Sequence, residues 1–197
     1  MEITKNTLVV DTDFLIHFAE SKIEPLDMFE HIQTIVKSLN KNAIMHCLVK
    51  KNELSLLNQQ QKPIIDNIFN QNIIQEASLE DIHQNDSVMT KYYIFLIEEL
   101  YQAINGEKLP VSGQDIFTYW IRKKNLGEIH SLAVCLMYEC SIFLSDDGDS
   151  KELAQYIKNT HSHTINVYNR LSLMELKPIQ QNINRKTRRI IAHQKAK

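Results

Sequence analysis

The first apolar run of the chain predicts a strand that is buried on both faces. Residues 7–10 read TLVV, without the alternation of a half-exposed strand, and Asp11 follows them. From Pro25 to Leu39 the apolar residues recur at helical spacing, which predicts a helix with proline in its first turn. Residues 43–49 predict a second strand, and residues 50–57 a short helix. This alternation indicates an α/β fold with a parallel sheet.

The middle of the chain, residues 62–124, has a different pattern. Its longest helical stretch runs over residues 89–104, and Gly106 provides a stop. A further helix is expected from Ser112, which forms an imperfect capping box with Asp115 three residues later. We interpret this region as a helical insertion that packs on the sheet.

The α/β pattern returns after residue 126. In order along the chain, the apolar residues predict a helix over 129–140, a buried strand over 141–145, a helix over 150–158, a last strand over 165–168 and a final helix over 171–176. We therefore expect one domain over residues 1–180, with residues 181–197 as a separate basic tail.

The composition is that of an ordinary globular domain. The chain has 197 residues, of which 43% are hydrophobic and 23% charged, and only 4 Gly and 4 Pro, which excludes low-complexity architectures. Cys47, Cys135 and Cys140 lie in apolar runs, which predicts buried thiols in a reducing compartment. The first residues resemble neither a signal peptide nor a membrane span, so we expect a cytoplasmic protein without membrane partners.

Charge is distributed unevenly along the chain. The net charge is −2, yet residues 185–197 carry six basic residues and no acid, so the rest of the chain carries −8. The basic residues at the start of this segment are Arg185, Lys186, Arg188 and Arg189. Such a tail either contacts a polyanion or is a solvated terminal segment, and the pattern favours neither interpretation.

Carboxylates follow two of the predicted strands. Asp11 and Asp13 come after the first strand, and Asp146, Asp147 and Asp149 after the strand at 141–145. A single acid at such a point is commonly a helix cap or a turn former, above all Asp149. Carboxylates brought together at one sheet edge repel one another and need a cation, and all-oxygen ligation suits Mg²⁺ or Mn²⁺.

Two segments together resemble a known family. VVDTDFLIHF near the start and LGEIHSLAVCLMYECSIFLSDDGDSKELA near the end are similar to the PIN-domain nucleases, which include many bacterial toxin ribonucleases. The resemblance covers roughly residues 7–57 and 126–177. It implies a PIN-like three-layer α/β/α fold with a central parallel sheet. The catalytic acids that it implies are Asp11, Glu53, Glu128 and Asp146, with Asp147 and Asp149 as further metal ligands beside Asp11, Glu128 and Asp146.

Some positions have a physical interpretation of their own. Glu128 lies at the border of the apolar face of its helix, where a first-turn glutamate also complements the helix dipole. Asp13 stands where the family often has a small hydroxyl residue. We interpret Tyr93 as a core residue, and His46 and His130 as partly buried or surface side chains.

The resemblance also implies an activity. It implies a metal-dependent ribonuclease that hydrolyses RNA phosphodiester bonds with Mg²⁺ or Mn²⁺, with an antitoxin protein as a partner and a homodimer as the assembly. Because an acidic pocket repels RNA, phosphate contacts must come from elsewhere. The basic tail and Lys123 and Lys124 are the candidates.

Two alternatives stay open. VVDTDFL also fits the DxD signature of haloacid dehalogenase-like phosphatases, with Asp11 as nucleophile and Asp13 as general acid. Leu15 stands where that family has Thr or Val, and Glu128 would have no role. The other alternative is a catalytically inactive PIN-like module that binds RNA or a protein.

Overall fold

A parallel sheet forms the centre of the molecule. The computed structural model describes residues 1–20, 25–54, 57, 61–121, 124–173, 175–177 and 179. Within these ranges five strands pair in parallel in the order β3-β2-β1-β4-β5. They are β1 (Thr7–Val10), β2 (Asn42–His46), β3 (Gln75–Ala77), β4 (Ile142–Leu144) and β5 (Asn166–Tyr168). The expected α/β fold with a parallel sheet is confirmed.

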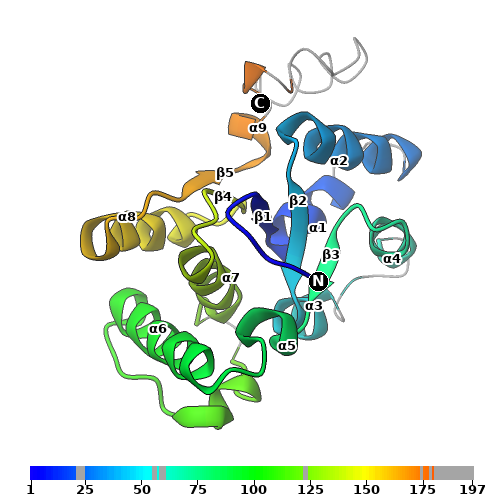
Figure 1. Cartoon of the computed structure of the whole chain (residues 1–197). Coiled ribbons are helices and arrows are strands. Elements are labelled where there is room, and N and C mark those ends of the chain that lie inside the picture. Colours follow the sequence, from blue (N-terminus) through cyan, green and yellow to red (C-terminus); the bar gives the residue numbers. More distant parts are fainter. Residues whose placement is uncertain are drawn as a thin grey trace.

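Helices cover both faces of this sheet (Figure 1). One face carries α1 (Thr12–Glu20), α2 (Pro25–Leu39), α3 (Cys47–Glu53), α4 (Lys62–Asn70) and α9 (Arg170–Leu173). The other carries α5 (Leu79–His83), α6 (Ser87–Asn105), α7 (Leu126–Met137) and α8 (Asp149–His161). Leu8 and Val10 enter the core on the first face and Val9 the core on the second. Burial on both sides explains why β1 is apolar throughout.

The second strand is shorter than its apolar run predicts. β2 ends at His46, and α3 already begins at Cys47, so the expectation of a strand through Val49 was wrong. The His46 ring accepts a hydrogen bond from the Leu48 N–H at 3.1 Å. This side-chain cap supplies a partner for an N–H group that the first turn of a helix leaves unpaired. The chain can therefore change from strand to helix inside an apolar run.

The middle region differs in part from the expected helical insertion. Its long helix is confirmed as α6, and Gly106 ends it in the left-handed conformation at φ +69°. The expected capping box at Ser112 was wrong, because Ser112 makes no side-chain cap and a 3₁₀ helix, η2 (Gly113–Phe117), follows it. The region also supplies edge strand β3. α1 was missing from the expected elements as well, since we expected the first helix only from Pro25.

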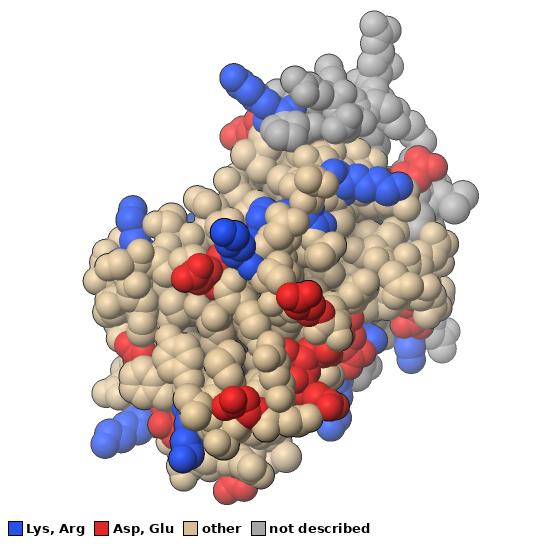
Figure 2. Space-filling view, viewed as in Figure 1, with Lys and Arg blue, Asp and Glu red and all other residues tan. Residues whose placement is uncertain are grey.

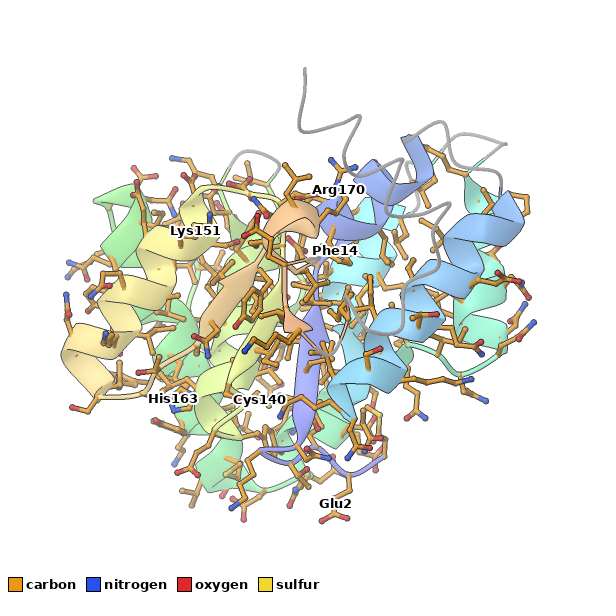
Figure 3. The ribbon with its side chains drawn as sticks, turned by 90° about the horizontal axis from the view of Figure 1, so that it is seen from above. Glu2, Phe14, Cys140, Lys151, His163 and Arg170 are labelled. Carbon is orange, nitrogen blue, oxygen red and sulfur yellow. The ribbon has the colours of Figure 1, made fainter. Side chains whose placement is uncertain are left out.

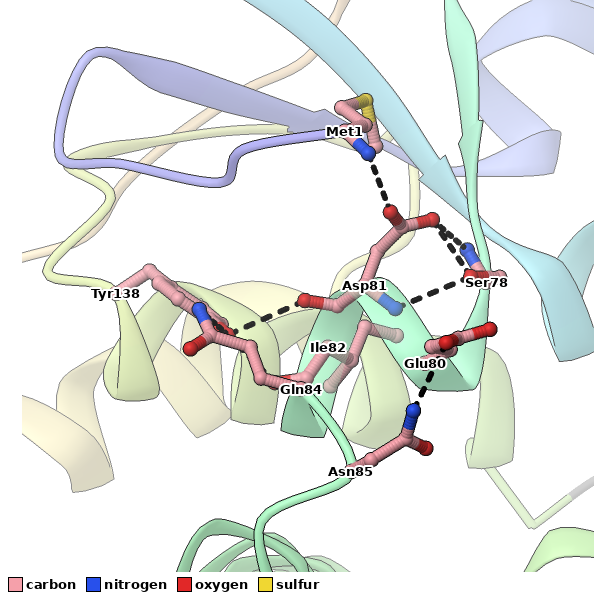
Figure 4. A network of polar contacts seen from close by, with 8 residues as sticks. All are labelled: Met1, Ser78, Glu80, Asp81, Ile82, Gln84, Asn85 and Tyr138. Atoms are coloured by element: carbon pink, nitrogen blue, oxygen red, sulfur yellow. Dashed lines mark hydrogen bonds and ion pairs between the residues drawn. The ribbon is translucent and has the colours of Figure 1, made fainter.

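A polar network holds α5 between the chain start and α7 (Figure 4). The Met1 amino group pairs with Asp81 at 2.6 Å, and Asp81 and Ser78 form a reciprocal capping box. The Tyr138 hydroxyl, just after α7, donates to the Ile82 carbonyl at 2.6 Å. On this face of the molecule acidic side chains gather over α5 (Figure 2). The contacts here are structural, and they hold the chain start and the end of α7 against α5, which directly follows β3.

The three cysteines form no disulfide. Cys135 and Cys140 are buried, as expected, while Cys47 is half-buried. Burial raises the pKa of the Cys140 thiol to about 12. Within the described part of the chain, no helix is long and apolar enough to cross a membrane.

Candidate functional site

The sheet order places the predicted acids at a topological switch point. From β1 the sheet continues through β2 and β3 on one side and through β4 and β5 on the other. In open parallel sheets ligands bind at such a point, beyond the carboxyl ends of the strands. Figure 3 shows Phe14 and Arg170 in the half of the molecule that holds this edge of the sheet, and Glu2 and Cys140 in the opposite half. Asp11 directly follows β1, and Asp146 lies two residues after β4.

Asp11 is a buried carboxyl group, with 1% of its surface exposed. Its backbone N–H donates to the Leu144 carbonyl at 2.9 Å, which extends the β1–β4 ladder by one bond. Its Oδ1 accepts from the Thr12 N–H at 2.8 Å. Burial, followed by the negative charges of Glu128, Asp13 and Glu53, raises the pKa of Asp11 well above its ordinary value. A positive charge placed beside Asp11 would favour its ionised form.

Glu53 reaches the same place from the end of α3. The Thr12 hydroxyl donates to its carboxylate, which links the start of α1 to α3. On the other side, Glu53 lies against Gly127 in the first turn of α7, where a Cβ atom would come within 2.6 Å of Glu53 Oε1. The absence of a side chain at Gly127 thus leaves room for the carboxylate to approach the helix backbone this closely.

Glu128 is half-buried in the first turn of α7. Its pKa is raised to about 8, first by burial and then by the negative charges of Glu53, Asp147 and Asp13, against a lowering contribution from the backbone at the start of α7. Carboxylates from the ends of β1, α3 and β4 and from the start of α7 therefore lie within electrostatic reach of one another.

Asp146 lies beside this group but is paired with a cation. Arg170, the first residue of α9, donates from Nε to Asp146 Oδ2 at 2.6 Å and from its backbone N–H to Oδ1 at 3.1 Å. Burial and then the Asp146 charge raise the pKa of Asp13. The Ser145 hydroxyl lies 3.4 Å from both carboxylate oxygens of Asp13. Sequence reasoning missed Arg170, because no motif marked it.

Asp147 and Asp149 differ in their surroundings. Asp147 contributes to the raised pKa of Glu128, as described above, and its Oδ1 accepts from the Asp149 N–H at 2.9 Å. Asp149 accepts from the Asn125 amide at 2.8 Å. It thereby connects the starts of α7 and α8, which is the structural role that acids at a helix start often have.

The structure does not describe the predicted RNA-contacting residues of the tail. Arg185, Lys186, Arg188 and Arg189 lie outside the described residues, as does Lys123. Lys124 pairs with Glu107 at 2.7 Å. Its ammonium group is therefore engaged by Glu107, which is not one of the predicted site acids.

A buried hydrogen-bond network links the helices that carry the two glutamates. The Tyr93 hydroxyl of α6 lies 2.7 Å from His46 Nε2 and 2.6 Å from His130 Nδ1. Since His46 Nδ1 accepts from the backbone, its Nε2–H donates to Tyr93, and Tyr93 donates to His130. Burial lowers the pKa of His130 to about 3 and lowers that of His46 well below its usual value, so both rings are neutral.

Sequence reasoning missed this network. Its only signal was position: His46 lies next to the predicted strand end, and His130 two residues after Glu128. His130 Nε2 is buried and has no hydrogen-bond partner among the described residues. The Trp120 ring stacks on the His130 imidazole, with the two ring centroids 6.0 Å apart.

Carboxylate oxygens are the type of ligand that a hard divalent cation prefers. Here several carboxylates lie within electrostatic reach of one another in a largely buried place, and burial with mutual repulsion raises the pKa of Asp11, Asp13 and Glu128. In the described part of the chain, no group of three or more His, Cys, Asp or Glu side chains is arranged to hold a metal ion.

Comparisons of the chain with family models, with curated proteins and with solved structures find no match.

Proposed function

We propose that this chain is a metal-dependent ribonuclease with a PIN-like three-layer fold, which hydrolyses RNA phosphodiester bonds at the strand-end carboxylates. One observation carries the proposal: Asp11, Glu53 and Glu128, from three separate parts of the sequence, approach closely enough to raise the pKa of Asp11. The two family-like segments supply these residues, and the packing of Glu53 on Gly127 gives a physical reason for the Gly-Glu pair.

In this proposal Asp11 and Glu128 hold Mg²⁺ or Mn²⁺, with Asp13 and Asp147 beside them. When bound, the cation would polarise the scissile phosphate and lower the pKa of an attacking water. Glu53, positioned by Thr12 and Gly127, accepts a proton from that water. Asp146 positions Arg170 at the rim, where a guanidinium group stabilises phosphate charge. An antitoxin protein and a second copy of the chain are the partners that belong to the same proposal.

The electrostatic interaction of Asp11 with Glu128 favours a nuclease over the phosphatase alternative. A phosphatase of the DxD type needs Asp11 and Asp13 but has no role for Glu128. Here Glu128 and Asp11 interact electrostatically, and Asp11 is buried. An inactive module would have no need to bear the energetic cost of these buried carboxyls.

The test compares cleavage of a labelled single-stranded RNA with Mn²⁺ and with a chelator. The variants are Asp11→Asn and Glu128→Gln, with Asp115→Asn, an exposed acid on η2, as the matched control. We expect the two site variants to lose at least about 100-fold in rate and the control to retain it. Hydrolysis of p-nitrophenyl phosphate without RNA cleavage would support the phosphatase, and absence of both activities the inactive module.

A further inference from the structure

A groove runs between α8 and the edge strand β5. It has a volume of about 300 Å³, and its lining includes Lys151, Gln155, Lys158, Thr164, Asn166 and Tyr168. Among the described residues β5 pairs only with β4, so the groove lies along an edge of the described sheet. An extended ligand can therefore enter it from the side.

The charge of this groove is opposite to that of the carboxylate site. Among the described residues, its lining contains two lysines and no Asp or Glu. Lys151 and Lys158 are both exposed, and neither forms an ion pair with another described residue. Both lie on the groove side of α8, seven residues and therefore about 10 Å apart along the helix axis. The groove thus offers two separate cationic contacts in one line.

One end of the groove, at Lys151 and Tyr168, lies near the carboxylate site. Lys151 follows Asp149 by two residues in the first turn of α8. At the end of β5, the Tyr168 carbonyl accepts from the Ser145 N–H at 3.2 Å, and the Ser145 hydroxyl contacts Asp13. Figure 3 shows Lys151 at the same edge of the molecule as Phe14 and Arg170. Lys158 lies two turns further from the acids.

We propose that this groove binds the backbone of single-stranded RNA and leads it to the carboxylates. The inference rests on the proposed function and adds the place where the substrate is held. A pocket of carboxylates repels a polyanion, so binding needs cations beside it, and lysine ammonium groups supply them as point charges. Lys151 contacts a phosphate close to the scissile bond, and Lys158 contacts one further along the strand. The Thr164 hydroxyl can donate to a phosphate or sugar oxygen.

The test measures binding of a fluorescent single-stranded RNA by anisotropy at several salt concentrations. It uses the Asp11→Asn chain, so that bound RNA is not cut. Adding Lys151→Gln and Lys158→Gln removes two phosphate contacts. We expect the slope of log K against log salt to fall by about 1.4, and affinity to fall about 25-fold near 0.1 M salt. Lys62→Gln with Lys91→Gln, exposed lysines on α4 and α6, is the matched control and should change neither value.

A second measurement separates binding from chemistry. In the chain with Asp11 intact, Lys158→Gln alone should still cleave a dinucleotide, which is too short to reach Lys158, while losing activity on long RNA. If the lysine variants bind RNA with the same affinity and the same salt slope as the Asp11→Asn parent, the groove is not the RNA-binding site. The nuclease proposal would not be affected by that result. If the Asp11→Asn parent binds no RNA and the intact chain cleaves none, both proposals fail. Binding of polyglutamate in place of RNA would instead assign the groove to an acidic protein.

Discussion

The ionised form of Glu128 is unfavourable in the folded chain. Its pKa is about 8 against an ordinary 4.5. The folded state therefore holds this proton more tightly than the unfolded chain between these two values, so the free energy of unfolding falls as pH rises through this window. The site thus carries a stability cost at neutral and higher pH, and this cost is absent below about pH 4.5.

Glu128→Gln should remove that cost, because glutamine has no charge to bury. In metal-free buffer, we expect the variant to be more stable than the unsubstituted chain by on the order of 2–4 kcal/mol at pH 8, with little difference near pH 4.5. Urea denaturation at the two pH values measures this. Glu30→Gln, an exposed position on α2, is the control and should show no such trend. A gain of equal size at both pH values would contradict the burial argument.

Gly127→Ala tests the close approach of Glu53. The new Cβ would lie 2.6 Å from Glu53 Oε1, which is the flexible end of a side chain and can shift. Since alanine also favours a helix by roughly 0.5–1 kcal/mol, we expect stability to change by less than about 1 kcal/mol. RNA cleavage should fall at least about tenfold, because the carboxylate is displaced.

The control for this change is Gly148→Ala, since a Cβ at Gly148 meets nothing within 4 Å. It should leave both stability and cleavage close to those of the unsubstituted chain. If Gly127→Ala retains full cleavage, the position of Glu53 is not important for the reaction.

At the scale of elements, Tyr93 joins α6 to the start of α3 and to α7. Tyr93→Phe would leave His46 Nε2–H and His130 Nδ1 buried without a partner. We expect a loss of about 2–4 kcal/mol in the free energy of unfolding, measured by urea denaturation. Tyr101→Phe is the control, because its buried ring is similar but its hydroxyl only reaches Glu107 at 3.4 Å. Equal losses in the two variants would argue against a special role for the network.

The elements that the sequence predicts well are those with strong apolar patterns. β1, α2, α6 and α7 follow from runs or helical spacing that burial explains directly. β3 could not be predicted, because a strand of three partly exposed residues, QEA, has no clear apolar pattern. It is a strand because it pairs with β2. The early start of α3 depends on the His46 cap, which is a side-chain contact and not a periodicity.

The same contrast holds for the site. The acids at strand ends are predictable, since parallel strands deliver their carboxyl ends to one edge. Tertiary packing decides which of these acids interact. It brings Asp11 and Glu128 within electrostatic reach and pairs Asp146 with Arg170. Arg170 is close to Asp146 only because β5 pairs with β4 and α9 follows. A partner this far away in the sequence cannot be identified from a local pattern.

At the scale of the whole molecule, a cation at the proposed site would couple its binding to folding and to pH. Such a cation would displace the proton of Glu128, whose pKa is about 8, and would favour the ionised form of Asp11, whose pKa burial raises. Apparent affinity for Mn²⁺ should therefore rise with pH, by up to ~10-fold per pH unit for each proton released. Because a cation that binds only the folded chain stabilises it, the effect is visible in the unfolding temperature.

We expect Mn²⁺ to raise the unfolding temperature more at pH 8 than at pH 6, and a chelator to reverse the rise. At a free concentration of about 100 times Kd, the stabilisation is about 2.7 kcal/mol. A chain with Asp11→Asn and Glu128→Gln together should show no such increase, while Asp115→Asn should behave as the unsubstituted chain does. If the double variant is stabilised equally, the cation binds elsewhere and these carboxylates are not its ligands. If no variant responds but RNA is still cleaved in chelator, the reaction needs no divalent cation.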